Sequence, residues 1–432
     1  MKIPVYKKYE LNDQLDVVLL EDSKVPLFHF RLVICCGSVL DPEGKEGLTR
    51  AAAGIMKRGA GKYSANKFFE AVEFTGGSIN VQTGYEDVII SGDFLSKDIE
   101  FCLELLATML FEPKFLNSEI NYYKKRTISQ IQSLKDNPSG FCNIVHKKNL
   151  FQDNPYGRPI IGYEKTVRNI NRKNITDMHQ NVLLKSKFIL TLAGDFENDK
   201  ILRTLNSLFT AKYVTPTVKI DKFRPPKLSE RKIYIFDKPD QSQSQIRIGN
   251  LGLIRNSPNF HKLQVTNTIF GGSFTSRLMT EVRVKKGLTY GIRSLVNSYK
   301  NTGSINISTF TKNETVSETV NIIFKEIEKL QNKNVTKKEL SGVQKYMTGL
   351  FPLSIETLKG ISGQLSNIYF YGLPKNSIEK YTENIYSVTD SNVNDMAGKY
   401  YSSKNSVITV LGRKDDIIKN LEKIGDVSVI DQ

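Results

Sequence analysis

The sequence predicts an α+β fold made of two copies of one domain, and three observations lead to this prediction. Apolar patterns with the period of a strand alternate along the chain with patterns of helical period. The strand-like segments mostly follow one another as hairpins, which suits an antiparallel-rich mixed sheet covered by helices better than a doubly wound parallel sheet. Motifs of the first half also return in the second half at a nearly constant distance.

The internal repeat is the clearest of these observations. Tyr156 and Tyr371 begin similar Tyr-Gly turns that are 215 positions apart. Gly194 and Gly412 end similar apolar strands that are 218 positions apart. Such nearly equal distances over a long stretch indicate two copies of one structural unit.

The composition between the copies sets the expected boundary. Residues 214–230 contain three prolines and many charges, which is typical of an extended linker. We therefore expect an N-terminal domain at residues 1–213 and a second domain at residues 231–432.

The elements expected in the first copy follow from periodicity, turn residues and one N-cap at Ser64. A Gly-Gly turn precedes the second pair of strands. The expected strands are residues 15–20, 27–36, 78–83, 87–94 and 188–195, and the expected helices are residues 48–57, 65–74, 97–111 and 117–135. In the second copy, residues 406–413 repeat the last of these strands.

Length and composition describe a globular protein without a membrane span. The chain has 432 residues, and this length is too great for one ordinary hydrophobic core. Of these residues, 39% are hydrophobic and 25% are charged. No apolar run approaches the roughly 18 residues of a transmembrane helix, and the first ten residues contain no signal-peptide core. The compartment stays open: periplasmic if Met1 follows removal of a signal, otherwise cytoplasmic.

Charge, cysteine and histidine content argue against other classes of site. The net charge is +16, but Lys and Arg are spread along the chain without interleaved aromatics, so we do not expect nucleic-acid binding. The four cysteines have no C-x-x-C spacing and the four histidines form no i, i+4 pair. Neither set predicts a disulfide framework or a metal site.

One segment carries a family resemblance, Gly47-Leu48-Thr49-Arg50-Ala51-Ala52-Ala53-Gly54-Ile55-Met56. It resembles the pitrilysin family, in which the inverted zinc motif H-x-x-E-H follows a Gly-Leu pair. The resemblance places the first metal-binding His at Arg50, the catalytic Glu at Ala53 and the second His at Gly54. The family's third ligand, a Glu six residues before an Asp-Asn-Pro turn, falls on Gln130.

These four positions therefore form a degenerate metal site. A zinc site needs three protein ligands and an open position for water, and Arg, Gly and Gln do not supply them. No H-x-x-E-H or H-E-x-x-H motif occurs elsewhere in the chain. We expect no metal in this chain and no peptide hydrolysis by the chain alone.

A second signature lies in the C-terminal half, within residues 270–290. It resembles the family's G-G-x-F-x-S-R-L motif followed by an Arg and, seven residues later, a Tyr. The resemblance implies that Arg283 and Tyr290 bind the scissile carbonyl and the developing oxyanion of a peptide at a zinc site in the opposite domain of a closed chamber. It also implies substrate contacts for Gly271, Gly272, Ser273 and Phe274. The phosphate-binding glycine patterns are missing here.

A third likeness concerns residues 241–249, which match the family's Q-x-x-I-x-x-G opening of the second domain. We expect an edge-leading strand there, along which an extended peptide could pair by backbone hydrogen bonds.

Because the resemblance covers nearly the whole chain, it implies two pitrilysin-like domains that form half of a clam-shell chamber. The expected function is that of the zinc-less subunit of a heterodimeric peptidase, with peptide as substrate. Its zinc-bearing partner subunit would hold the metal, and this chain would supply the Arg/Tyr pair. The alternatives are a structural subunit, like the core proteins of respiratory complexes, and a peptide-binding subunit without proteolytic role.

Overall fold

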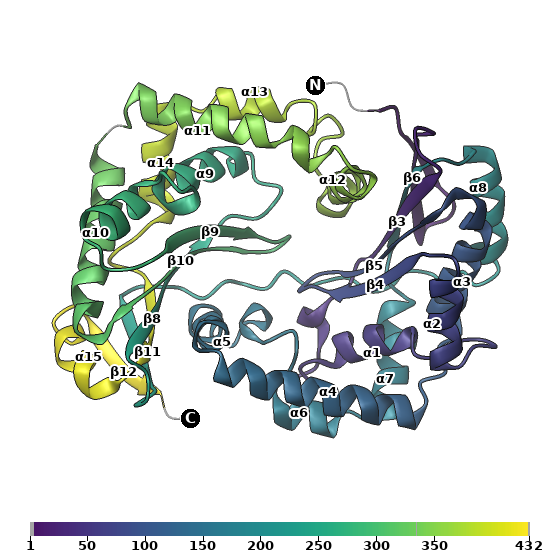
Figure 1. The fold of residues 1–432 in the computed structure, drawn as a ribbon, viewed down its shortest axis with the longest axis horizontal. Coiled ribbons are helices and arrows are strands. Elements are labelled where there is room, and N and C mark those ends of the chain that lie inside the picture. Colours follow the sequence, from purple (N-terminus) through teal and green to yellow (C-terminus); the bar gives the residue numbers. More distant parts are fainter. Residues whose placement is uncertain (1–3, 334, 431–432) are drawn as a thin grey trace. The chain divides into compact units, whose positions relative to one another are not determined.

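The computed structural model describes residues 4–333 and 335–430. It contains two compact units, each drawn from separate stretches of the chain (Figure 1). The first unit comprises Met1–Gln132, Pro159–Asp221 and Phe351–Glu379, and the second comprises Ser133–Arg158, Lys222–Leu350 and Lys380–Gln432. In the described part of the chain, no helix is both long enough and apolar enough to cross a membrane.

The first unit is built on a six-stranded mixed sheet with the order β1-β2-β6-β3-β5-β4. Strands β2 and β6 are parallel, and every other neighbouring pair is antiparallel. The strands are β1 (Lys7–Glu10), β2 (Leu15–Glu21), β3 (Leu27–Ile34), β4 (Ser78–Thr83), β5 (Val88–Leu95) and β6 (Phe188–Gly194).

The second unit repeats this sheet in the order β12-β7-β11-β8-β10-β9. Five strands of each sheet correspond in chain order and position, namely β2 to β6 and β7 to β11. The sixth differs, because the outermost strand β12 runs parallel to its neighbour, whereas β1 runs antiparallel. The strands are β7 (Lys232–Asp237), β8 (Gln243–Gly252), β9 (Ile292–Ser298), β10 (Gly303–Lys312), β11 (Val407–Gly412) and β12 (Asp426–Ile430).

Helices cover both sheets. Those from the N-terminal half are α1 (Leu48–Met56), α2 (Ala65–Phe74), α3 (Ile99–Phe111), α4 (Asn117–Asp136), α5 (Pro138–Phe151), α6 (Glu164–Asn169), α7 (Arg172–Met178) and α8 (Asn198–Leu205). Those from the C-terminal half are α9 (Phe260–Asn267), α10 (Val316–Asn332), α11 (Lys337–Leu350), α12 (Leu358–Tyr371), α13 (Tyr381–Tyr386), α14 (Asp390–Tyr400) and α15 (Lys414–Leu421).

The expected fold class is confirmed, since each unit is an α+β arrangement of one mixed sheet and its helices. The predicted helix at residues 65–74 is α2, whose N-cap Ser64 accepts a hydrogen bond from the Lys67 backbone N–H. The predicted helix at residues 97–111 begins later, at Ile99, because a short 3₁₀ turn precedes it. The predicted linker, residues 214–230, contains no helix or strand. The domains expected at residues 1–213 and 231–432 remain a prediction from the sequence repeat.

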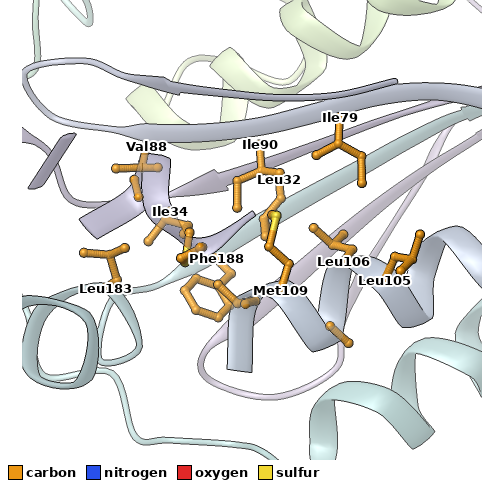
Figure 2. Close-up of a cluster of buried hydrophobic side chains, with 14 of the residues drawn as sticks. Leu32, Ile34, Ile79, Val88, Ile90, Leu105, Leu106, Met109, Leu183 and Phe188 are labelled. Carbon is orange, nitrogen blue, oxygen red and sulfur yellow. The ribbon is translucent and has the colours of Figure 1, made fainter. Parts of the chain in front are cut away.

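The core of the first unit lies between one face of its sheet and α3. Figure 2 shows Leu105, Leu106 and Met109 of this helix among sheet residues such as Leu32 and Phe188. Alternate residues of β3, from Phe28 to Ile34, point to this face because successive strand side chains face opposite sides. The apolar face of α3 therefore packs against one face of the first sheet.

The opposite face of each sheet is covered by a helix from the other half of the sequence. Helix α12, from the C-terminal half, contacts β3 and β6 in the first unit. Helix α5, from the N-terminal half, contacts β8 and β11 in the second unit. The two halves therefore exchange one helix each, which the repeat alone did not predict.

The two exchanged helices meet equivalent residues. Arg31 lies opposite Thr191 in the first sheet, and Arg247 lies opposite Thr409 in the second. The Thr191 hydroxyl is 3.0 Å from the Ser366 hydroxyl of α12, and the Thr409 hydroxyl is 3.1 Å from Nδ1 of His146 on α5. The duplication therefore extends to the residues that attach each exchanged helix.

Arg247 is buried beneath α5 and is held by neutral acceptors. Its guanidinium donates to the Asn143 side chain at 2.5 Å and to the Ser139 carbonyl and hydroxyl oxygens at 3.0 and 2.8 Å. Burial lowers the pKa of this arginine from its ordinary value. The helix thus supplies the hydrogen bonds that a buried guanidinium requires.

His146 of α5 packs directly against the sheet. Its Nε2 lies 3.2 Å from Oδ1 of Asn306, and a Cβ added to Gly249 would come within 2.5 Å of that nitrogen. Gly249, the last residue of the Q-x-x-I-x-x-G motif, is therefore required by the packing of α5. Burial, assisted by the charge of Arg247, lowers the pKa of His146 to about 3.

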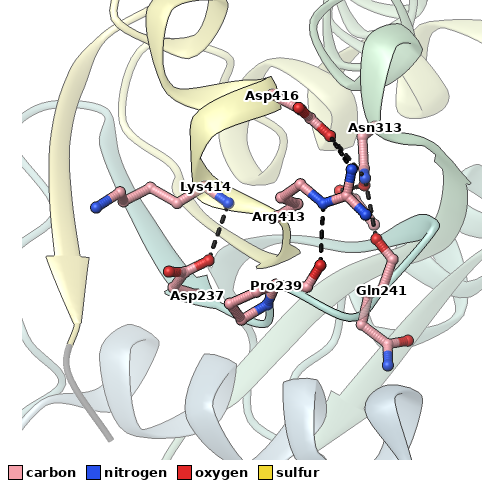
Figure 3. Close-up of polar contacts among 8 residues, drawn as sticks. Asp237, Pro239, Gln241, Asn313, Arg413, Lys414 and Asp416 are labelled. Atoms are coloured by element: carbon pink, nitrogen blue, oxygen red, sulfur yellow. Dashed lines mark hydrogen bonds and ion pairs between the residues drawn. The ribbon is translucent and has the colours of Figure 1, made fainter.

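The expectation of an edge-leading strand at residues 241–249 is wrong. Strand β8 pairs along its length with β10 on one side and with β11 on the other, so its backbone groups are already used. The turn before it is also fixed: the Asn313 side chain donates to the Gln241 carbonyl at 3.0 Å, and Nε of Arg413 donates to the Pro239 carbonyl at 2.9 Å (Figure 3). The edges of this sheet are β9 and β12.

The low pKa of His146 predicts a pH dependence of stability. Because the folded-state pKa lies below the ordinary value, the unfolded chain binds more protons between these two values, and stability is lost as the pH falls through this range. This group should lower the free energy of unfolding by about 2 kcal/mol between about pH 7 and 5. The measurement is urea unfolding at both pH values for the wild type and for His146→Gln, which keeps a donor but cannot be protonated. The loss should be smaller in the variant by this amount, and equal losses in both proteins would show that His146 is not held neutral by the fold.

Candidate functional site

The four degenerate metal positions lie on α1 and α4, two helices of the first unit. The structure brings Arg50 and Gln130 together, because Nη2 of Arg50 donates to Oε1 of Gln130 at 3.2 Å. Nη1 of Arg50 donates to the Tyr123 hydroxyl at 3.3 Å, and the guanidinium carbon lies 6.0 Å from the centre of the same ring. Residues that are 80 positions apart in sequence thus form one small polar cluster.

The other two positions leave no room for ligands. Ala53 is completely buried in the core of the unit. A Cβ added to Gly54 would lie 3.3 Å from Cε2 of Tyr123, so the tyrosine ring occupies the space into which a longer side chain would extend. Burial is the main cause of the raised pKa of Tyr123, which stays a neutral phenol.

The cluster does not fit a zinc ion. The family's metal would need imidazole and carboxylate ligands, whereas Arg50 carries a permanent positive charge and no acceptor. Gly54 has no side chain, and the Gln130 amide oxygen is already engaged by Arg50. In residues 4–333 and 335–430, no group of three or more His, Cys, Asp and Glu side chains is placed to hold a metal ion.

Helix α1 is nevertheless firmly anchored at its N-terminus. The buried Asp41 carboxylate accepts hydrogen bonds from the Gly47 and Thr49 backbone N–H groups, at 2.8 and 2.7 Å, and from the Thr49 hydroxyl at 2.6 Å. Burial raises the pKa of Asp41 to about 6, although these hydrogen bonds oppose the shift. Gly47 has φ of 93°, which favours glycine, and an added Cβ would come within 2.8 Å of the Ile161 carbonyl oxygen. Gly47 is therefore required by the backbone conformation at the start of α1, whether or not a metal is bound.

The second candidate cluster lies in the second unit and contains Arg283, Tyr290 and Phe274. The guanidinium carbon of Arg283 lies 4.9 Å from the centres of both rings. Tyr290 is 79% exposed and Phe274 is 73% exposed, so the cluster faces solvent in this unit. In the part of the chain that the structure describes, no carboxylate pairs with Arg283. Its five N–H donors therefore remain available to an incoming oxygen atom.

Local backbone geometry holds this pair in place. Arg283 lies in a π-helical turn, η7 (Met279–Lys285), and such turns often redirect a side chain at functional sites. Gly287 adopts φ of 63° and reverses the chain toward Tyr290. The buried Thr289 hydroxyl bonds the Gly291 N–H and carbonyl at 3.1 and 3.0 Å, which fixes the backbone on both sides of Tyr290. The tyrosine is thus exposed on a rigid segment.

The neighbouring arginine of the same signature has a different role. Arg277 forms a two-pronged ion pair with Glu339 of α11, with N–O distances of 2.7 and 2.9 Å. The hydrogen bonds to Glu339 raise the pKa of Arg277. This contact attaches the loop at residues 273–276 to α11, so Arg277 is a structural residue.

The glycines expected to contact substrate are also explained by packing. Gly271 is buried in the π-helical turn η6 (Thr268–Gly272), and an added Cβ would come within 2.7 Å of the Ser294 side chain on β9. A Cβ at Gly272 would lie 3.1 Å from the Asn267 side chain. Ser273 and Phe274 follow in the loop, and Phe274 contacts Arg283. A substrate contact by the two glycines remains a prediction.

Sequence reasoning missed three residues that shape these clusters: Tyr123, Thr289 and Glu339. Tyr123 lies seven residues before Gln130 on α4, so helical periodicity would have placed both on the face that meets α1. Thr289 precedes Tyr290 in a segment that is neither helix nor strand, so no periodic pattern marked it. Glu339 gave no signal, because its partner Arg277 is 62 residues away.

Fold and sites together define a two-domain, peptidase-like protein in which the expected metal position does not fit a metal. Comparison with known families agrees with this class. Residues 16–164 match the model of insulinase (peptidase family M16), and residues 169–347 match the model of the peptidase M16 inactive domain. The chain therefore belongs to peptidase family M16, the family of the pitrilysin resemblance.

Individual relatives are distant but align over most of their length. The chain is 23% identical over 412 residues to the "Non-peptidase homolog YmxG" of Helicobacter pylori, with 94% of each chain covered. It is 24% identical over 354 residues to the "Uncharacterized zinc protease YmxG" of Bacillus subtilis, covering 81% of this chain and 85% of the relative. The structure of a peptidase M16 inactive domain from Pseudomonas fluorescens superposes with a TM-score of 0.87 at 22% identity, over 94% of this chain and 98% of that one.

The geometry of the first cluster predicts what would be needed to restore metal binding. We expect the wild-type chain to bind no stoichiometric zinc. The triple variant Arg50→His/Gly54→His/Gln130→Glu should also bind none, because the Tyr123 ring fills the space beside position 54. Adding Tyr123→Ala should open this space and give up to one zinc per chain, measured by elemental analysis after dialysis.

Tyr123→Ala alone is the matched control and should remain free of zinc. One tightly held zinc in the wild-type chain at these positions would contradict the assignment of a degenerate site. Stoichiometric zinc in the triple variant would show that Tyr123 does not block the site.

Proposed function

We propose that this chain is the zinc-less subunit of a two-component zinc metallopeptidase. In this proposal a zinc-bearing M16 subunit holds the metal and activates the water, and the present chain completes the peptide chamber. Arg283 and Tyr290 bind the carbonyl of the scissile peptide bond and stabilise the negative charge that develops on its oxygen.

The observation that carries the proposal is the arrangement of Arg283 and Tyr290. Their side chains lie against one another on an anchored segment, and the guanidinium has aromatic neighbours instead of a carboxylate. A structural arginine in this chain looks different, since Arg277 is neutralised by Glu339. The Arg283 guanidinium therefore keeps donors that an anionic oxygen could accept from, which supports a role in binding such an oxygen.

The chemistry of the pair suits a tetrahedral oxyanion. The phenol O–H and the guanidinium N–H groups are hydrogen-bond donors, and the guanidinium adds a fixed positive charge. Donors held in advance act most strongly where charge appears during the reaction. Hydrolysis also needs an activated water, and the degenerate cluster in this chain does not provide one. A second subunit is therefore part of the proposal. The name "Non-peptidase homolog" given to a relative is in keeping with a chain that does not hydrolyse peptides alone.

The test is peptide hydrolysis by the chain mixed with a zinc-bearing M16 subunit. Tyr290→Phe and Arg283→Ala should each lower kcat by roughly 10²–10³-fold, the magnitude known for one oxyanion donor. The loss should appear in kcat more than in KM, because these donors act mainly on the transition state. Arg283→Lys should recover only part of the activity, since an ammonium lacks the planar arrangement of donors.

Two exposed residues of the first unit, Arg203 and Tyr213, provide matched controls. Arg203→Ala and Tyr213→Phe remove the same groups elsewhere and should leave kcat unchanged. Normal turnover by both site variants, with unchanged binding of the partner subunit, would show that the chain is a scaffold. Failure to bind any zinc-bearing M16 subunit would instead favour a structural or purely peptide-binding role.

A further inference from the structure

The two exchanged helices, α5 and α12, correspond to one another position by position. Each begins after an N-cap side chain that accepts a hydrogen bond from a backbone N–H three residues later, Asn137 for α5 and Thr357 for α12. These N-caps are 220 positions apart in the sequence. His146 and Ser366, which contact the equivalent threonines of the two sheets, are also 220 positions apart. Each residue of α5 can therefore be compared with its counterpart on α12.

The second unit shows which contacts an arginine on this face of the sheet makes. Nε of Arg247 donates to the Asn143 side chain, and Nη2 donates to the carbonyl and hydroxyl oxygens of Ser139. Nε and Nη2 form one edge of the guanidinium, and a carboxylate binds arginine with its two oxygen atoms on such an edge. Arg277 holds the two oxygen atoms of Glu339 in this way. In the second unit, two neutral residues of α5 thus occupy the position of a carboxylate.

In the first unit, α12 supplies neither of these side-chain acceptors to the equivalent Arg31. The counterpart of Asn143 is Gly363, which has no side chain. The counterpart of Ser139 is Lys359, whose ammonium group is a donor and carries a positive charge. Nε of Arg31 is buried and has no hydrogen-bond partner in residues 4–333 and 335–430. Such unsatisfied buried groups are rare and costly in folded proteins.

The surroundings of Arg31 leave space for an acceptor. A Cβ added to Gly363 would meet no atom within 4 Å, so this turn of α12 is open on the side where a side chain would extend. Burial lowers the pKa of Arg31 from its ordinary value. The charge of Asp87 opposes this shift, but it acts without a hydrogen bond to the guanidinium. An acceptor that enters beside Gly363 would therefore reach donors that the chain itself does not use.

Lys359 adds a second positive charge to this face of the sheet. The pKa of Asp93 is lowered mainly by its hydrogen bond with His29, and the charge of Lys359 contributes to the shift. Lys359 is therefore close to β3 and β5, the strands that carry His29 and Asp93. Since the α5 counterpart of this lysine is a neutral serine, the first unit has exchanged a neutral acceptor for a cation.

Two further polar atoms beneath α12 lack partners in the described part of the chain. The Ser362 side chain, next to Gly363, is completely buried, and its hydroxyl makes no hydrogen bond. Nε2 of His29 is also unpaired, and this residue is only 1% exposed. His29 precedes Arg31 by two positions on β3, so both side chains face α12. The polar layer between α12 and the first sheet is thus incomplete without a ligand.

We propose that the first unit binds a carboxylate group beneath α12, with its two oxygen atoms on the Nε/Nη2 edge of Arg31 and with Lys359 as a second cation. The ligand provides the oxygen atoms that Ser139 and Asn143 provide in the second unit, and it thereby attaches α12 to its sheet. A small free acid and the end of a peptide chain both carry this group. The inference does not depend on peptide hydrolysis or on the Arg283 cluster.

The first experiment follows the arginine Nε–H signals of the full chain by NMR with isotope-labelled arginine. The probe is sodium acetate, and sodium chloride at equal ionic strength is the control for screening. We expect a saturable shift of the Arg31 signal with acetate and no such shift with chloride. Arg247 is an internal control, because its Nε–H already bonds Asn143, and its signal should stay in place. The Arg31 signal is assigned by its absence in Arg31→Gln.

The second experiment gives α12 the acceptor that α5 has. In Gly363→Asn the new side chain should bond Nε of Arg31 within the chain and lower the affinity for acetate on the order of ten-fold or more. Gly349→Asn is the matched control, because Gly349 also lies in a helix and an added Cβ there also meets no atom within 4 Å. This control should keep the affinity of the wild type. Asparagine is a better helix former than glycine, so neither substitution should impair folding.

Two peptides separate the sources of the carboxylate: acetyl-Gly-Ser-Gly with a free C-terminus, and the same peptide with a C-terminal amide. Tighter binding of the free acid than of acetate indicates the end of a peptide, whereas equal or weaker binding indicates a small free acid. Both results support the site. A shift of Arg31 that chloride or the amidated peptide reproduces, no shift with acetate, or an unchanged acetate affinity in Gly363→Asn overturns it. These outcomes leave the proposed function untouched, because no zinc-bearing subunit is present.

Discussion

Both faces of each sheet have to be covered, and the second face of each is covered by a helix from the other half of the chain. Strand side chains alternate between faces, so the strands that give Phe30 and Leu32 to the core also place Arg31 on the opposite side. In the second sheet the equivalent arginine, Arg247, receives its hydrogen bonds from α5. Each half of the sequence therefore leaves one sheet face to be covered by a helix encoded in the other half.

The packing around the four degenerate metal positions does not depend on a metal. Helix α1 is stabilised by Asp41 at its N-terminus and by the Arg50 contacts with α4, none of which involves a metal. A guanidinium that bonds Gln130 links the two helices, as a shared metal ion would do. The helix remains a rigid part of the first unit.

Much of the fold could be predicted from the sequence, because strands and helices have different apolar periods and the repeat doubles the evidence. The positions of Arg50, Gln130, Arg283 and Tyr290 could be expected only from the family resemblance, and the structure places each pair together. The exchange of α5 and α12 could not be predicted, because periodicity shows that a helix has an apolar face but not which sheet it covers. The error at residues 241–249 has the same origin, since an isolated strand pattern does not reveal how many neighbours the strand has.

Arg277 and Arg283 belong to one signature and show how structure separates residues that sequence treats alike. Both arginines are half-buried. Arg277 has a carboxylate at 2.7 Å, and its charge is used to attach a loop. Arg283 has only ring faces beside it in the described chain, and these contacts leave its N–H groups unoccupied. Aromatic contacts favour a cation without neutralising it. The charge of Arg277 is thus used within the fold, whereas Arg283 retains its positive charge and open donors, the features on which its proposed role in oxyanion binding rests.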